Sequence, residues 1–176
     1  TNRPKREDQG GLWDFAQGYA YSKLGQPDFA QVYLARVRKL AETTKANFRM
    51  HSGKDLLSIV ADILEGEIQR TAGNLDAAIT AFKRAVEIQN TLEYDEPQPL
   101  PFSAHHWLGA ALIEAKRFDE AEQVYREDLK EHPRNGWSLF GLKQALAGKG
   151  VTSLEIDKEF AESWARSDTW IRASRF

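Results

Sequence analysis

The sequence of 176 residues contains no cysteine and no apolar run that approaches the roughly 20 residues of a membrane span. The absence of cysteine excludes disulfides, thiolate nucleophiles and cysteine-ligated metals, but leaves the redox compartment open. The first residues, TNRPKREDQGG, are polar and have no apolar segment after the basic start, so they are not a signal peptide. We therefore predict a soluble protein without membrane insertion, in the cytoplasm or the periplasm.

The chain also lacks a large net charge of either sign. Its formal net charge is -2, with 41% hydrophobic and 28% charged residues. This balance gives no electrostatic reason to expect nucleic acid or an acidic membrane surface as a partner. The length fits one domain that buries roughly 70% of its unfolded surface. Because Thr1 is not a natural initiator, we expect an excised or processed piece of a longer chain.

Strand signals are weak, whereas apolar residues recur at spacings of three and four, which predicts an all-α fold. We expect four antiparallel helical hairpins in one domain over residues 11–176. Their approximate ranges are 11–44, 55–89, 102–133 and 135–166, followed by a C-terminal tail. Residues 1–10 are predicted to be disordered or an artificial addition. Residues 45–54 and the proline-rich 90–101 are predicted connectors.

Local signals predict where several helices begin and what they bury. Asp55 and Asn135 are expected N-caps, and Thr152-Ser-Leu-Glu155 has the spacing of a capping box. In the first connector, Phe48 and Met50 are expected to pack against neighbouring helices. The last helix is expected to bury four apolar residues, namely Leu154, Ile156, Phe160 and Trp164.

A register of small residues repeats in the first three hairpins. Each has a glycine followed 12 residues later by an alanine: Gly18 and Ala30, Gly66 and Ala78, Gly109 and Ala121. Small residues at these positions allow two antiparallel helices to approach closely. Four residues after each alanine comes a large apolar residue, Leu34, Phe82 or Tyr125, which we expect to fill the space beside the contact.

This pattern resembles the tetratricopeptide repeat (TPR), a helix-turn-helix unit of about 34 residues. The best match is Leu108-Gly109-x-x-Leu112, then Ala121-x-x-x-Tyr125, then Pro133, with His105 where the family usually has tryptophan. YDEPQP, LGAAL, the segment from Ala121 to Leu146 and the final ASRF also resemble the C-terminal region of longer bacterial TPR proteins of uncharacterised function. The resemblance implies a right-handed α-α superhelix. Lys143 and Glu155 occupy the small-residue places of the fourth hairpin, as in a solvated terminal cap.

Nothing in the sequence indicates an enzyme, and we predict no catalytic, cofactor or metal site. The glycine-rich phosphate motifs, HExxH and GxSxG are absent. Adjacent helical residues point about 100° apart, so His105 and His106 are not expected to bind one metal ion together. His51 and His132 are predicted to lack acidic or histidine partners at helical spacing.

The resemblance implies that the first helix of each hairpin lines a concave groove, where a partner peptide or helix would bind. Phe15 and Tyr19 stand where a lysine and an asparagine would be needed to clamp an acidic chaperone C-terminus, so that partner class is not expected. For Phe15, Ile63 and Phe140, burial in the core between hairpins is the favoured interpretation. The candidate partner-binding residues are Tyr19, Lys23, Glu67, Arg70, His106, Trp137, Phe140 and Gln144.

Two further interpretations stay open. The predicted function is a non-enzymatic protein-interaction scaffold; the alternative is a structural C-terminal lobe that packs within a longer TPR protein or self-associates. The loop Tyr94-Asp95-Glu96-Pro97 is a candidate for folding over a bound peptide, although a spacer between two hairpins is the favoured interpretation.

Overall fold

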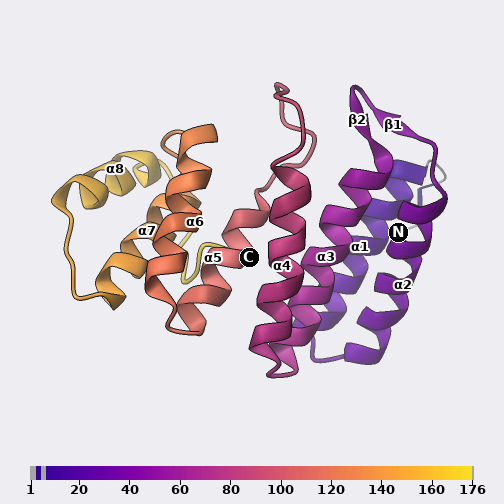
Figure 1. Ribbon diagram of the computed structural model, residues 1–176, viewed down its shortest axis with the longest axis horizontal. Coiled ribbons are helices and arrows are strands. Elements are labelled where there is room, and N and C mark those ends of the chain that lie inside the picture. Colours follow the sequence, from indigo (N-terminus) through magenta and orange to yellow (C-terminus); the bar gives the residue numbers. More distant parts are fainter. Residues whose placement is uncertain (1–2, 5–6, 176) are drawn as a thin grey trace. The chain divides into compact units, whose positions relative to one another are not determined.

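The computed structural model describes residues 3–4 and 7–175, and the fold is an all-α, TPR-like helical repeat (Figure 1). The helices are α1 Glu7–Lys23, α2 Pro27–Thr43, α3 Gly53–Thr71, α4 Leu75–Gln89, α5 Ala104–Glu114, α6 Phe118–Glu131, α7 Gly136–Gly148 and α8 Leu154–Trp164. Two short strands, β1 Asn47–Phe48 and β2 His51–Ser52, pair antiparallel. No helix among these residues combines the length and the apolar character that crossing a bilayer demands.

The chain divides into two compact units, one up to Ala104 and one from His105 onward. The sequence predicts a single domain and a continuous superhelix, and both stay predictions. The start of α1 differs from expectation, because the helix begins at Glu7 and not near Gly11. Residues 7–10 are therefore helical, and disorder is wrong for them. Residues 1–2 and 5–6 lie outside the described residues.

The first unit is built on close contact at small residues. A Cβ added at Gly66 of α3 would lie 2.2 Å from Phe82 Cε1 of α4, and Ala78 is fully buried beside them. The predicted packing of this hairpin is therefore confirmed. Gly18 of α1 differs, because a Cβ there would meet Tyr33 and Leu64, not Leu34.

In the second unit, Tyr125 of α6 lies between two glycines. A Cβ would approach Tyr125 Cζ to 2.3 Å from Gly109 of α5 and to 2.1 Å from Gly141 of α7. The predicted contact between Gly109 and Tyr125 is confirmed, and Gly141 adds a second. Helix α8 has no buried residue, and Leu154 is 82% exposed, so the expected burial of that residue is wrong. The solvated helix agrees with a terminal cap.

The first connector contains the β1–β2 hairpin, which the sequence did not predict. Arg49 at its tip donates to Asp95 Oδ1 at 2.7 Å and to two carbonyls of the proline-rich loop, those of Glu96 and Pro97. Met50 is 58% exposed, so its predicted packing is wrong. The proline-rich loop is thus fastened to the hairpin within the first unit.

Helix caps agree with the sequence in one case and differ in two. The Asn135 side chain accepts from the backbone N–H groups of Trp137 and Ser138 at the start of α7, as predicted. Helix α3 begins at Gly53, so Asp55 lies in its first turn and does not cap it. At α8 the capping hydroxyl belongs to Ser153, which accepts from the N–H of Ile156.

Candidate functional site

Four of the candidate partner-binding residues meet on α1 and α3 of the first unit. The fully buried Glu67 accepts from Lys23 Nζ at 2.8 Å and from Arg70 Nε at 3.1 Å. The Lys23 ammonium lies 4.8 Å from the centroid of the Tyr19 ring. We call Tyr19, Lys23, Glu67 and Arg70 the Glu67 cluster. Its one carboxylate and two cationic groups sum to a net charge of +1, and the carboxylate holds both cationic groups in place.

Exposure separates these four residues. The side chains of Lys23 and Arg70 are 34% and 16% exposed, whereas Glu67 and Tyr19 are buried. Phe15, 5.8 Å from Tyr19 between ring centroids, and Ile63 are also buried, as the core interpretation requires. Lys23 and Arg70 are therefore the members that a partner could contact, and Glu67 orients them.

The two aromatic candidates of the second unit pack against α8. The Trp137 ring meets Trp164 edge to face at 5.6 Å, and Phe140 lies 5.5 Å from Phe160. These aromatic pairs hold the last hairpin together. Their burial is partial, so they contribute more to packing than to an open surface.

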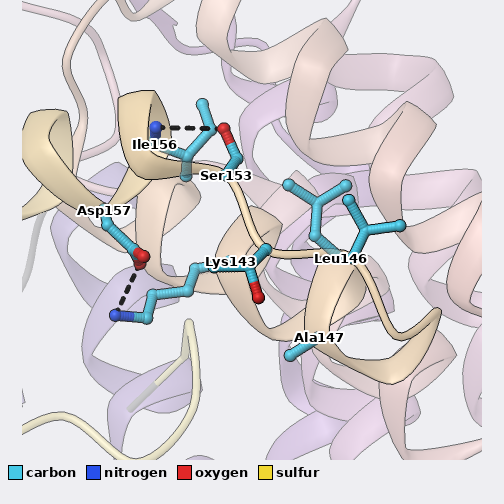
Figure 2. Close-up of a pocket in the computed structure, with 8 residues that line it drawn as sticks. Lys143, Leu146, Ala147, Ser153, Ile156 and Asp157 are labelled. Carbon is cyan, nitrogen blue, oxygen red and sulfur yellow. Dashed lines mark hydrogen bonds and ion pairs between the residues drawn. The ribbon is translucent and has the colours of Figure 1, made fainter.

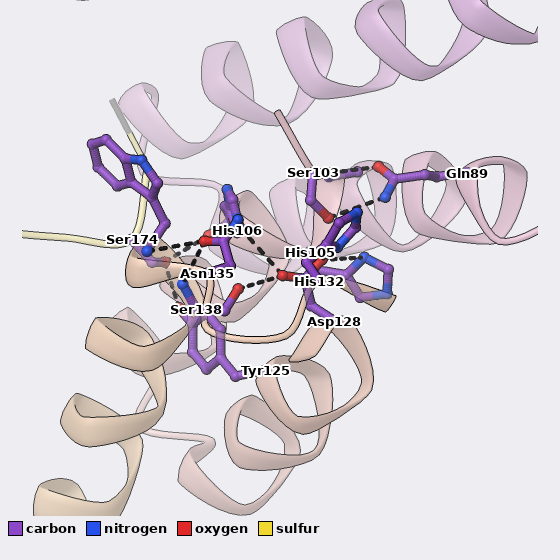
Figure 3. A network of polar contacts seen from close by, with 12 residues as sticks. Gln89, Ser103, His105, His106, Tyr125, Asp128, His132, Asn135, Ser138 and Ser174 are labelled. Carbon is purple, nitrogen blue, oxygen red and sulfur yellow. Dashed lines mark hydrogen bonds and ion pairs between the residues drawn. The ribbon is translucent and has the colours of Figure 1, made fainter. Parts of the chain in front are cut away.

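The other two candidates of that unit contact the chain's own segment 172–175. The amide of Gln144 on α7 donates to the carbonyl of Arg172 at 3.3 Å. The backbone carbonyl of His106 on α5 accepts from Ser174 Oγ at 2.9 Å (Figure 3). Ser174 is fully buried and also contacts the Tyr125 hydroxyl at 2.5 Å. Sequence reasoning missed this segment because one serine in a polar tail gives no periodic signal.

A second polar cluster surrounds the fully buried side chain of Asp128 on α6 (Figure 3). It accepts from the Ser138 hydroxyl and pairs with His132 Nδ1 at 2.9 Å. His105 Nδ1 lies 3.6 Å and His106 Nε2 3.4 Å from its two oxygens. No group of three or more acidic or histidine side chains in the described part of the chain has an arrangement that could hold a metal ion.

One histidine prediction is wrong. His132 has an acidic partner four residues earlier, a spacing that the sequence already contained, whereas the partner of His51, Asp95 at 3.3 Å, is far away in the sequence and not at helical spacing. His105 and His106, although adjacent, both lie near the one carboxylate of Asp128. They approach its two different oxygens, which is how neighbours about 100° apart on a helix can share it.

In the cluster around Asp128, the pKa values of two histidines are shifted in opposite directions. The hydrogen bond with Asp128, helped by the charge of Glu131, raises the pKa of His132. Burial lowers the pKa of His105, although the charges of Asp128 and Glu127 act the other way. His132 thus stabilises the fold when protonated, whereas His105 is favoured in its neutral form.

We predict opposite pH dependences for two matched variants, His132→Asn and His105→Asn. Because the folded pKa of His132 is raised, its contribution is complete below its unfolded pKa of about 6.5 and is lost as the pH rises through the folded value. Wild type should therefore exceed His132→Asn in unfolding free energy by more at about pH 5.5, below the unfolded pKa, than at about pH 8.5, well above it. Urea unfolding at both pH values measures this difference.

The lowered pKa of His105 gives the reverse sign. Its neutral form supports the fold above about pH 6.5, and that support is lost as the pH falls toward the folded value. The advantage of wild type over His105→Asn should therefore shrink on acidification. Equal pH trends for the two variants would contradict the assignment of the two histidines.

One small pocket lies between α7 and α8 (Figure 2). It measures about 90 Å³ and is lined by residues that include Leu146, Val151 and Ile156. The Lys143 ammonium pairs with Asp157 at 2.7 Å at its edge. Ligand pockets usually span about 300–1,000 Å³, and this one contains none of the candidate residues, so it is not a convincing small-molecule site.

Comparison with known proteins supports the repeat assignment. Residues 63–91, which cover the end of α3 and all of α4, match the family model described as tetratricopeptide repeat. The chain is similar to nephrocystin-3 of Xenopus tropicalis, 30% identical over 81 residues, and to that of Homo sapiens, 32% identical over 77 residues. These alignments cover 45% and 43% of this chain and 6% of each relative.

The chain thus spans a small part of the length of these relatives, which are eukaryotic and not bacterial. The family match falls on the hairpin in which Gly66, Ala78 and Phe82 show the predicted register. The match and the helical fold together support the tetratricopeptide repeat superfamily.

Proposed function

We propose that this protein is a non-enzymatic interaction scaffold that binds a short peptide segment of a partner protein on the first helices of its hairpins. TPR proteins generally mediate protein-protein interactions, and the match at residues 63–91 brings this expectation to the chain. The observation that carries the proposal is in the second unit. There, the non-helical segment 172–175 lies against α5 and α7, the first helices of their hairpins.

The Glu67 cluster is the corresponding candidate surface of the first unit. Lys23 and Arg70 come from neighbouring first helices and are held in place by one buried carboxylate. Such pre-orientation reduces the entropy lost when a side chain contacts a partner. The net charge of +1 favours a peptide with acidic or carbonyl groups at this place.

A displayed library of short random peptides, selected on the full chain, tests this function. We predict enrichment of peptides whose binding falls at least about tenfold in Arg70→Ala or Gln144→Ala, the loss expected from one charge-assisted or main-chain contact. Arg84→Ala is the matched control for Arg70, because Arg84 pairs with Asp62 through another part of α3. Failure to enrich any peptide, or binding unaffected by both surface variants, would refute the proposal.

A structural lobe is the second candidate function. Trp170 and Leu154 are 95% and 82% exposed, and large exposed apolar side chains favour packing against another protein surface. The resemblance to the C-terminal region of longer bacterial TPR proteins supports the same reading. Solution mass over a range of concentrations distinguishes the two, since self-association predicts a mass that rises with concentration and falls back in Trp170→Ser.

A further inference from the structure

The segment 172–175 has the arrangement of a peptide ligand tethered to its own binding site. Every residue from 165 to 170 is exposed, and Ser174 is then fully buried. The exposed stretch is turned by one bond from Trp164 Nε1 to the carbonyl of Thr169 at 2.8 Å. An exposed linker followed by a buried anchor is the pattern expected of a peptide that is bound by its own chain.

The anchor is held by a hydroxyl-specific pair of hydrogen bonds. The hydroxyl of Ser174 donates to the carbonyl of His106, so its single proton is used there. The Tyr125 hydroxyl, 2.5 Å away, must then donate to Ser174 Oγ. Burial raises the pKa of Tyr125, which keeps the phenol protonated and able to donate. Only a group that both accepts and donates satisfies this pocket.

Two glycines make room for the phenol at this pocket. A Cβ at either Gly109 or Gly141 would come within 2.6 Å of the Tyr125 hydroxyl oxygen. Any larger residue at these positions would displace the phenol. The Tyr125 hydroxyl therefore reaches the place where Ser174 sits because both neighbouring helices, α5 and α7, carry glycine there.

Flanking contacts select the rest of the segment. Gln144 donates to the main-chain carbonyl of Arg172, a contact that any residue provides. The contact of Arg175 is specific to its side chain, which is 13% exposed and whose guanidinium lies 4.0 Å from the Glu114 carboxylate. The surface thus binds a main-chain carbonyl at position 172, a small hydroxyl side chain at position 174 and a cationic side chain at position 175.

We infer that the surface formed by Glu114, Tyr125, Gln144 and the His106 carbonyl is a docking site for a partner peptide with a serine or threonine directly followed by arginine. Segment 172–175 is its resident ligand, which such a partner must displace. This inference rests on the proposed function and adds the chemistry of the partner and the competition within the chain.

The competition has a predictable direction. A short flexible linker gives a tethered ligand an effective concentration in the millimolar range. The apparent affinity of a free peptide is reduced by the fraction of sites that stand empty. Weakening the resident segment should therefore raise the affinity of the site for a peptide added in solution.

The test uses the full chain and a fluorescent peptide that copies residues 168–175. Ser174→Asp leaves every residue of the docking surface intact and places a carboxylate against the His106 carbonyl, which expels the resident segment. We predict that this variant binds the peptide at least about tenfold more tightly than wild type. A matched peptide with alanine in place of the serine should bind at least about tenfold more weakly, because two hydrogen bonds are lost.

Circular dichroism and thermal unfolding verify that the variant is folded, and Ser174→Ala, a milder change, is measured in parallel. Equal binding of the serine and alanine peptides to both variants would overturn the inference and leave the proposed function standing. Equal affinity of wild type and both variants for the serine peptide would overturn the competition. Absence of binding of either peptide to folded variants would count against the docking site, whereas the library selection decides the proposed function separately.

Discussion

Replacing Asp128 by alanine is expected to lower the free energy of unfolding by about 3–5 kcal/mol, the cost typical of removing one partner from a buried charged network. The carboxylate is fully buried and accepts from Ser138 while it pairs with His132. Its removal leaves the buried Ser138 hydroxyl without that acceptor and removes the charge that stabilises protonated His132. Urea unfolding followed by tryptophan fluorescence measures the change.

Glu127→Ala is the matched control for this experiment. Glu127 is the neighbouring carboxylate on α6, is 55% exposed and pairs with Lys130 at the surface. Surface ion pairs contribute little to stability, so the free energy of unfolding of this variant should equal that of wild type. Asp128→Asn retains an acceptor for Ser138, so its free energy of unfolding should lie between those of Asp128→Ala and wild type. Equal stability of Asp128→Ala and wild type would show that the cluster does not support the fold.

Replacing Gly66 by alanine is expected to destabilise the first unit by about 1–3 kcal/mol, the usual effect of overpacking a close contact. In an open helix the same change would stabilise by about 0.5–1 kcal/mol, because glycine is the poorer helix former. Here the new Cβ would lie 2.2 Å from Phe82 Cε1, so a ring must move. Chemical denaturation measures whether Gly66→Ala lowers or raises the free energy of unfolding.

Two further variants separate packing from helix propensity. At Gly10 the nearest atoms to a new Cβ belong to the guanidinium of Arg3, at 3.0 Å, which can shift more easily than a packed ring, so Gly10→Ala should be much less destabilising than Gly66→Ala. Phe82→Leu removes part of the ring and should restore some of the loss when it is combined with Gly66→Ala. Additive effects of the two changes would contradict a direct contact between these positions.

The sequence predicted the hairpins because their determinants are local. The 12-residue separation of glycine and alanine correctly placed Phe82 against Gly66 and Tyr125 against Gly109. The same register failed at Gly18, where Tyr33 of the same hairpin and Leu64 of another hairpin fill the space. Packing between hairpins depends on residues far apart in the chain, so a pattern inside one hairpin does not determine it.

The polar contacts show the same limit. The sequence predicts Lys23, Glu67 and Arg70 as separate groove residues, and the structure joins them in one cluster. The four-residue spacing of Asp128 and His132 is present in the sequence, although we did not predict the pair from it. In contrast, no local pattern connects Arg49 with Asp95 or Ser174 with His106, because these contacts join segments that only the fold brings together.

The accessibility of position 174 shows whether segment 172–175 occupies the docking site. Because the chain has no cysteine, Ser174→Cys introduces a unique thiol at a fully buried position, and Ser167→Cys provides an exposed control in the same segment. We predict that the thiol at position 174 reacts with a thiol reagent at least about tenfold more slowly than the control, as buried cysteines do. The serine peptide should accelerate its reaction. Equal rates for the two thiols without peptide would contradict the occupied docking site.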